Sequence, residues 1–243
     1  MAKIKIKKSG LLAAARRRAD ELGYARVIIG LLCILFAVGT GAHLYRPTLP
    51  YMLALTPWFL LACGFAVLLP SLGSGGLRFG LWVAVTYGLT FFLEALGVAT
   101  GLVFGEYVYG PTLGLSAFGV PLVIAFNWVL VVYGATRMAG RLLRSDLLVA
   151  VLTGLIATAF DWVMEPVAIR LNYWTWAGGD IPMQNYAAWF AIALISSYLY
   201  RKAVRRPATG GGPSGPAGTL AGAYVIIQAV FFGLLRAGWA LGL

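Results

Sequence analysis

Two acidic residues stand four positions apart near the end of an apolar run, in the stretch Phe160-Asp161-Trp162-Val163-Met164-Glu165-Pro166. On a helix this spacing puts Asp161 and Glu165 on the same face. Ionisable groups within a hydrophobic span are costly to bury and usually serve a function. The simpler alternative is that both acids only touch the membrane interface.

The composition indicates a polytopic membrane protein. The chain has 243 residues, of which 60% are hydrophobic, and a mean hydropathy of +0.84, which lies far outside the range of soluble proteins. Its net charge is +11, but the basic residues fall in short clusters between apolar runs. Membrane topology therefore explains the charge better than a nucleic-acid partner does. We expect no removable signal peptide at the N-terminus.

Seven apolar runs predict an all-α membrane helical bundle of about seven transmembrane helices. The runs cover residues 26–44, 50–69, 79–104, 117–138, 146–167, 185–200 and 218–241. Most of them reach the roughly 20 residues that a helix needs to cross a bilayer. We therefore expect a multi-pass protein of the cell (inner) membrane, with residues 1–25 as a basic cytoplasmic segment and residues 26–243 as a single transmembrane domain.

The positions of the basic residues predict the orientation of these spans. With a cytoplasmic N-terminus, 16 of the 19 Lys and Arg residues fall on the cytoplasmic side, and only Arg46, Arg170 and Arg236 fall on the other. Such an asymmetry is typical of multi-pass proteins. A missed or additional span in the middle of the chain would destroy it.

Acidic and amide side chains from several spans should lie at one depth. Glu94 and Asp161 each lie 15 residues after the start of a run, at residues 79 and 146, and the two spans have the same direction. At 1.5 Å per residue, both acids are about 22 Å from the cytoplasmic face. Asn127 and Trp128, on the span between them, reach a similar level. These residues are therefore expected to form one site.

The same aromatic spacing follows both acids. Residues 13 and 15 positions further on are Tyr107 and Tyr109 after Glu94, and Trp174 and Trp176 after Asp161. This pattern suggests a parallel internal repeat of spans 3–4 and 5–6, with the site between the two copies. The density of aromatic residues also predicts that residues 170–184 fold against the protein, because such side chains are unfavourable in water.

The residue inventory excludes several kinds of site. His43 is the single histidine, so metal sites built from several histidines and paired haem ligands are excluded. No lysine lies within an apolar run to form a retinal Schiff base, and no Asp-rich pair is present for a magnesium diphosphate. We expect neither a metal nor another cofactor.

Carboxyl, amide and aromatic groups in lipid still allow acid chemistry. A carboxylic acid in an apolar pocket stays protonated near neutral pH and can act as a general acid. Aromatic faces stabilise a developing carbocation. Such a site suits the protonation of an alkene in a lipid-soluble substrate, and it equally suits a proton-coupled transporter.

A combination of motifs between about residues 80 and 200 carries a resemblance to a known family. The motifs are Glu94-x-x-Gly97-x-x-x-Gly101-x-x-x-Gly105-x-Tyr107-x-Tyr109, Gly119-Val120-Pro121-Leu122, Asp161-x-x-x-x-Pro166, Trp174-x-Trp176 and Pro182-x-x-Asn185-Tyr186-x-x-Trp189-Phe190. They resemble the CruF-type carotenoid biosynthesis family of membrane carotenoid 1,2-hydratases. The resemblance implies the addition of water across the terminal C1=C2 double bond of an acyclic carotenoid end group.

For this reaction we assign roles from chemistry. Asp161 or Glu94 protonates C2, and a second carboxylate, with Glu165 as a further candidate, holds the water that attacks C1 together with Asn127 or Asn185. The expected substrate-binding residues are Asn127, Trp128, Trp162, Tyr107, Tyr109, Trp174, Trp176, Asn185, Tyr186 and Trp189. The expected partners are a lipophilic carotenoid and membrane lipid, without nucleic acid.

Two other functions fit the same residues. A carotenoid end-group cyclase or isomerase would share the first protonation and then close a ring or lose a proton. A membrane transporter or carotenoid-binding protein would convert nothing. The mass of the product distinguishes the three: water added, mass unchanged, or no conversion.

Overall fold

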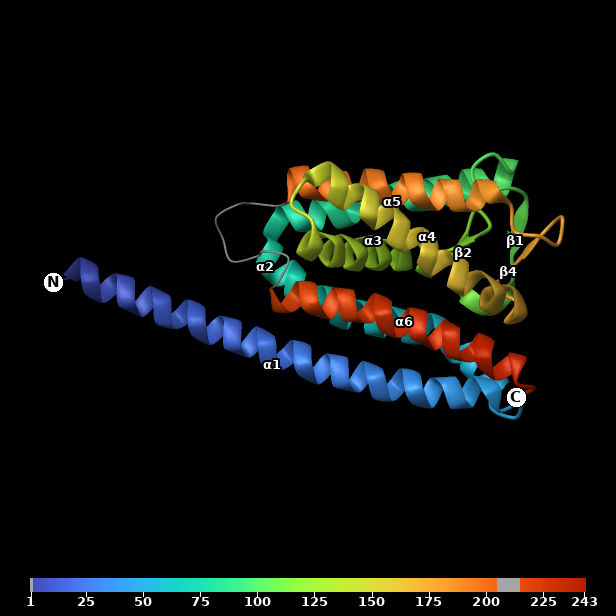
Figure 1. Cartoon of the computed structure of the whole chain (residues 1–243), viewed down its shortest axis with the longest axis horizontal. Helices are drawn as coiled ribbons and strands as arrows, with labels where there is room; N and C mark the ends of the chain where they lie inside the picture. Colours follow the sequence, from blue (N-terminus) through green and yellow to red (C-terminus); the bar gives the residue numbers. More distant parts are fainter. Residues whose placement is uncertain (1, 205–214) are drawn as a thin grey trace.

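The computed structural model describes the backbone of residues 2–204 and 215–243 and the side chains of residues 19–204 and 215–243. Its helices are α1 (Ala2–Leu44), α2 (Leu49–Thr100), α3 (Leu122–Leu142), α4 (Asp146–Arg170), α5 (Met183–Ala203) and α6 (Pro216–Ala240). They lie side by side in an elongated bundle (Figure 1). The predicted all-α membrane bundle is thus confirmed.

Helix α2 consists of two rods joined at a sharp bend. Its 52 residues would measure roughly 78 Å if straight, against a hydrocarbon core of about 30 Å. Gly76 has φ 60° and ψ −161° inside the helix, and there the chain folds back on itself (Figure 1). The second rod ends at Gly101, whose φ of 69° is left-handed and whose N–H bonds Gly97 O. Glycine suits both positions because a side chain would be strained there.

Among the described residues, five helices are long and apolar enough to cross a membrane: Ala19–Leu44 of α1, then α2, α3, α4 and α6. Helix α5 has 21 residues but is less apolar than these five. The expected count of seven therefore stays a prediction, which requires two crossings by α2 and one by α5. Several boundaries differ from expectation. Helix α1 is continuous across residue 25, the first rod of α2 continues past residue 69 to the bend at Gly76, and the second rod ends at Thr100 instead of residue 104. Helix α3 begins at Leu122 instead of residue 117.

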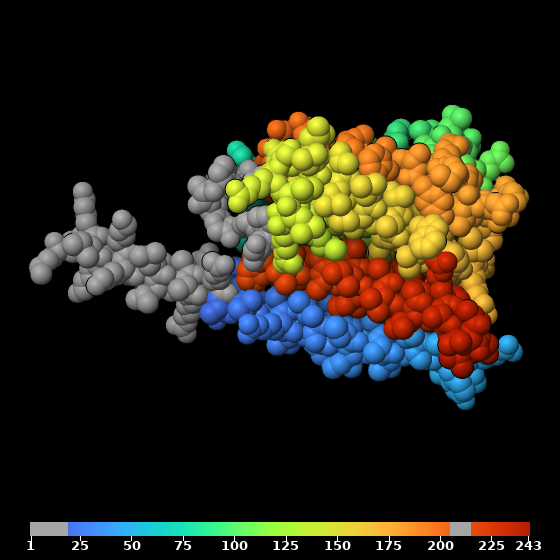
Figure 2. All heavy atoms as spheres, in the orientation of Figure 1, coloured from blue at the N-terminus to red at the C-terminus, as the bar shows by residue number. Residues whose placement is uncertain are grey.

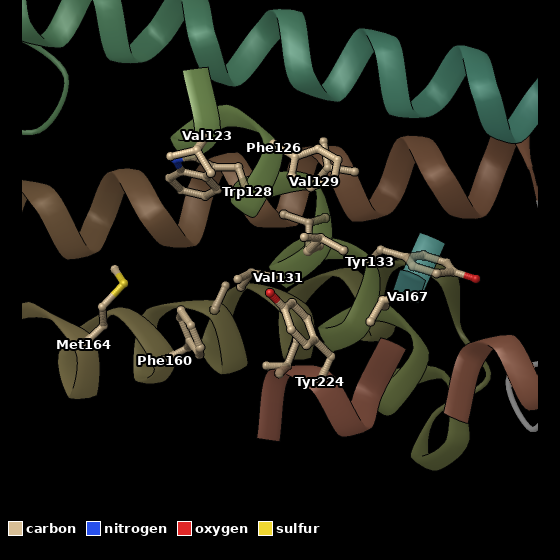
Figure 3. Packing of buried hydrophobic residues seen from close by; sticks show 14 of the residues in the cluster. Val67, Val123, Phe126, Trp128, Val129, Val131, Tyr133, Phe160, Met164 and Tyr224 are labelled. Atoms are coloured by element: carbon tan, nitrogen blue, oxygen red, sulfur yellow. The ribbon is translucent and has the colours of Figure 1, made fainter. Parts of the chain in front are cut away.

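Helix α3 occupies the centre of the bundle. It packs against α2, α4 and α6, while α5 lies against α4 and α2, and α1 covers α6 from outside. Figure 3 shows Val131 of α3 between Phe160 of α4 and Tyr224 of α6. A Cβ at Gly134 of α3 would overlap α6. Close approach through small residues is the usual way in which helices pack in lipid.

The outer surface of the bundle is apolar, as a lipid-facing surface requires. Helices α1 and α6 form one long face of the molecule (Figure 2). Exposed residues of α1 on it include Val27, Ile34 and Val38. Scattered exposure of this kind along whole helices is expected where the solvent is hydrocarbon.

Short strands in the connections were not predicted from the sequence. Strand β1 (Tyr107–Tyr109) follows α2 and pairs antiparallel with β4 (Trp174–Trp176), which follows α4. A second hairpin joins β2 (Ser116–Ala117) to β3 (Val120–Pro121), after the 3-10 helix η1 (Pro111–Leu113). The β1–β4 sheet lies across one end of the bundle (Figure 1). As expected for residues 170–184, Trp174 and Trp176 are buried against the protein.

The register of the β1–β4 sheet favours the internal repeat. Tyr107 is opposite Trp176, Val108 is opposite Thr175, and Tyr109 is opposite Trp174. If β1 and β4 are equivalent elements, this register is symmetric about the central pair, as a twofold relation between two repeats requires. The repeat itself stays a prediction.

Charged residues separate to the two ends of the bundle. Arg46 and Arg170 lie at the helix ends beside the β1–β4 sheet, whereas Arg78 and Arg144 lie at the opposite end. This separation agrees with the expected orientation.

We predict that reporter fusions after Arg78 and Arg144 report the cytoplasm, and that fusions after Arg46 and Gly110 report the other side. A cytoplasmic signal at Gly110 together with an external signal at Arg78 would contradict the orientation, whereas the same signal at Arg46, Arg78 and Gly110 would contradict the double crossing by α2.

Candidate active site

A small cavity lies inside the bundle beneath the β1–β4 sheet. It is lined by Glu94, Phe104, Tyr107, Tyr109, Ile124, Asn127, Trp128, Asp161, Met164, Glu165, Trp174, Trp176, Asn185 and Trp189. Its volume is about 40 Å³. Since one water molecule needs roughly 10–15 Å³ of such space, about three waters fit. A large organic molecule would enter only if the surrounding side chains moved.

Glu94 reaches the cavity from the second rod of α2 and accepts hydrogen bonds on both oxygens. Tyr107 and Tyr109 donate their hydroxyls to Oε2 at 2.5 and 2.8 Å, and Trp128 of α3 donates Nε1–H to Oε1 at 2.8 Å. Burial, and then the nearby Glu94 carboxylate, raises the pKa of Tyr107 well above its usual range. The tyrosine therefore stays protonated and can serve as a donor.

Glu165 of α4 has a matching set of donors. Trp174 and Trp176 each donate Nε1–H to Oε2 at 3.0 Å, and Asn185 donates Nδ2–H to Oε1 at 3.3 Å. An indole N–H can only donate, so Oε2 accepts two bonds and cannot itself carry a proton in this arrangement. Glu165 is 1% exposed. The interpretation that it only touches the interface is therefore wrong.

Asp161 is the least satisfied of the three acids. Asn185 donates Nδ2–H to its Oδ2 at 2.6 Å. Its Oδ1 is buried and has no hydrogen-bond partner within the described part of the chain. An unpaired carboxylate oxygen is expensive in an apolar interior, whereas a protonated Oδ1 would carry no charge. The hydrogen-bond pattern therefore distinguishes Asp161 from Glu94 and Glu165.

The acids face one another across the bundle. Helix α2 packs beside α3 and α5, and α4 packs beside the same two helices, so α2 and α4 occupy opposite corners of a four-helix arrangement. Glu94 thus enters the cavity from the side opposite Asp161 and Glu165. The prediction that Glu94 and Asp161 lie together is confirmed in its geometry, and their roles remain proposals.

Aromatic rings form much of the cavity wall. Trp128 and Trp189 stack with ring centroids 3.7 Å apart and an interplanar angle of 22°. Tyr107 lies 5.0 Å from Trp176 across the β1–β4 sheet. None of the lining residues is basic. Acidic groups and aromatic faces without a nearby cation are an environment that stabilises positive charge.

Two of the predicted substrate-binding residues do not line the cavity. Trp162 is 58% exposed, and the guanidinium of Arg236 lies 5.0 Å from its ring centre. Tyr186 is only partly buried and is also absent from the cavity wall. Each follows an inward-facing residue, Asp161 or Asn185, by one position. One step on a helix rotates the side chain by about 100°, so both point elsewhere.

The structure brings together all the other predicted residues and adds three apolar ones. Phe104, Ile124 and Met164 line the cavity but were missed from the sequence. Helical spacing offered a signal for two of them, because Met164 follows Asp161 by three positions and Ile124 precedes Asn127 by three. Asn185 was expected to contact substrate or water, and its amide N–H instead joins two carboxyls.

Comparison with known proteins identifies relatives of the chain. A family model described as carotenoid biosynthesis protein matches residues 52–240. The bisanhydrobacterioruberin hydratase of Haloarcula japonica is 30% identical over 176 residues, which are 63% of this chain and 56% of that relative. The matched region thus spans little more than half of the relative's length. No solved structure gives a significant match. The family match includes every residue of the cavity and leaves α1 outside.

A glycine next to β1 allows the sheet to close over the cavity. The N–H of Gly110 donates to Tyr173 O at 2.8 Å, and a Cβ at Gly110 would overlap the carbonyl oxygen of Asn172. We predict that Gly110→Ala costs about 1–3 kcal/mol and lowers the apparent unfolding midpoint in detergent by roughly 2–12 °C. Tryptophan fluorescence would follow the transition.

Gly178 is the matched control for this substitution. It lies in the same connection, and a Cβ there would meet no described atom within 4 Å. Gly178→Ala should therefore leave the midpoint within about 2 °C of the wild type, as expected for a change below about 0.5 kcal/mol. Equal midpoints for the two variants would contradict the role of close β1–β4 contact in holding the sheet.

Proposed function

The chain belongs to the carotenoid biosynthesis protein family, and we propose that it is a membrane carotenoid hydratase that adds water to the terminal C1=C2 double bond of an acyclic end group. The relative from Haloarcula japonica, named a hydratase, supports this reaction class. The observation that carries the proposal is the unequal hydrogen bonding of three buried carboxyls, because hydration requires one group that gives a proton and another that receives one.

Asp161 is the proposed acid. Its Oδ1 is buried without a hydrogen-bond partner among the described residues, and Asp161 lines the same cavity as Glu94. The Oδ1 proton passes to C2 of the alkene, the C1=C2 π bond provides the electron pair of the new C–H bond, and C1 becomes a tertiary cation. The N–H of Asn185 then stabilises the aspartate through Oδ2.

Carboxyl groups and aromatic rings that are in place before the reaction stabilise the cation at C1. Glu94 and Glu165 each accept bonds from three donor groups, and such bonds stabilise the ionised form of a carboxyl. The stacked Trp128 and Trp189 present aromatic faces. Preorganised groups of this kind do not need to reorient as charge develops, which makes them effective in a dry site.

Water capture completes the reaction. Asn127 of α3 lies beside Trp128, which donates to Glu94, so Asn127 and Glu94 are the proposed holders of the water. The water oxygen bonds to C1, and its released proton goes to the free lone pair of Glu94 Oε1. That proton returns to Asp161 through water in the cavity, so one cycle consumes one water and no net proton.

The cavity has room for water beside the acids, as hydration requires. A volume of about 40 Å³ holds about three waters beside the acids. A cyclase would need enough space to fold six carbons of the end group into a ring before any water reached the cation. In the proposed mode the end group enters extended, beneath the β1–β4 sheet, and the remaining polyene lies in the lipid along the bundle.

Amide substitutions of the two acids test the assignment. Asp161→Asn and Glu94→Gln keep the shape of the side chain but cannot donate or accept the catalytic proton. Each should lower turnover by a factor on the order of 10² or more, measured as hydrated pigment formed by membranes from a lycopene-producing cell. Trp162→Phe, which changes an exposed ring outside the cavity, is the control and should retain most of the activity. Full activity in both acid variants would overturn the mechanism.

Solvent deuterium tests the direction of protonation. In D2O the hydrated product should carry one deuterium at C2, because that carbon receives its proton from an exchangeable carboxyl. The position can be assigned by mass and NMR spectroscopy of the purified pigment. A cyclised product whose formula differs from that of the substrate only by deuterium would support the cyclase alternative and contradict hydration. Unaltered pigment would support transport or binding instead.

A further inference from the structure

One buried polar residue contacts the site from outside the cavity wall. Gln228 lies on α6, is 2% exposed, and donates Nε2–H to Asn127 Oδ1 at 3.4 Å. Its Oε1 is buried without a hydrogen-bond partner in the described part of the chain. Burying a primary amide in an apolar bundle is unfavourable unless its bonds are made. A methionine or leucine would fill the same space at lower cost.

The hydrogen bond from Gln228 determines how the amide of Asn127 is turned. Asn127 lines the cavity, whereas Gln228 does not. Because Oδ1 of Asn127 accepts the bond from α6, its Nδ2–H group is left for the cavity side. Trp128, the next residue of α3, donates to Glu94 Oε1 at 2.8 Å. Asn127 and Glu94 both line the cavity, so a water inside it can meet the amide N–H of the first and the free lone pair of the second.

We propose that Gln228 is a positioning residue for water capture: it holds Asn127 so that the amide N–H binds the attacking water. The inference rests on the proposed hydratase function. A water that accepts from Asn127 and donates to Glu94 keeps its remaining lone pair for C1. Gln228 touches neither substrate nor water, and it acts through Asn127 alone.

A residue that positions the attacking water changes how the cation is partitioned between two products. After protonation at C2 the cation either gains water or loses a proton from C2 to the Asp161 carboxylate, which regenerates the alkene. In D2O the regenerated alkene carries deuterium at C2 whenever the proton that leaves is the original one. The ratio of deuterated recovered substrate to hydrated product therefore measures water capture independently of the protonation rate.

Gln228→Met tests the proposal with an unbranched side chain of similar volume. The loss of this hydrogen bond should raise the ratio of deuterated substrate to hydrated product by about two- to tenfold. A purely structural effect would lower both species together and leave the ratio unchanged. An unchanged ratio would overturn the proposal even if the total activity fell. Gln228→Leu provides the same measurement if the methionine variant does not accumulate.

A double-mutant cycle determines whether Gln228 acts through Asn127. Asn127→Ala should raise the ratio by itself, and adding Gln228→Met should raise it no further. Ser71→Ala removes a buried hydroxyl that hydrogen-bonds Tyr133 outside the cavity wall, and it should leave the ratio at the wild-type value. Independent, multiplicative effects of the two substitutions would refute the positioning role. If the wild type forms no hydrated product, the proposed function and this inference both fail, whereas a hydrating wild type with an unchanged variant ratio refutes the inference alone.

Discussion

Three carboxyl groups buried in a membrane bundle impose the main constraint on this structure. A carboxylate in hydrocarbon is stable only if protein groups replace its lost hydration, and the apolar helices of such a bundle have few groups that can donate a hydrogen bond. The connections provide them instead. The aromatic residues of β1 donate to Glu94, those of β4 donate to Glu165, and pairing of the two strands holds both sets in place. The sheet is therefore as much a part of the acid site as the helices are.

The three carboxyls do not receive the same number of hydrogen bonds, and this difference is the basis of the proposed chemistry. Glu94 and Glu165 each accept from three donor groups, while Asp161 accepts from Asn185 alone and keeps one oxygen unpartnered among the described residues. A site with three equally satisfied carboxylates would have no proton to give. A site with three unsatisfied acids would be neutral and would stabilise a cation poorly. In the proposed mechanism this mixture provides one acid next to two carboxyls whose ionised forms are stabilised by hydrogen bonds.

Packing in lipid explains why the site can be built at all. With no hydrophobic driving force between helices, the bundle depends on close contact and on interhelical hydrogen bonds. Glycines such as Gly134 and Gly154 leave room for side-chain and backbone atoms of the facing helix, which a Cβ at either position would overlap. Gln228 on α6 joins α3 by a polar contact in the same environment. Because α3 touches α2, α4 and α6, its rotation sets where Asn127 and Trp128 face.

Features that depend on local composition and residue spacing, such as the helices and the shared face of two acids, could be predicted from the sequence. Long apolar runs predict the helices, and the four-residue spacing of Asp161 and Glu165 predicts a shared face, because helix geometry is fixed. Equal distances along two spans were enough to expect Glu94 near Asp161. Three other features required the three-dimensional structure. The pairing of β1 with β4 and the carboxyl oxygen that lacks a hydrogen-bond partner are two of them. The third is that Trp162 and Tyr186 point away from the cavity. These features arise from contacts between segments far apart in the chain and from the rotation of each helix, which packing sets and local spacing does not.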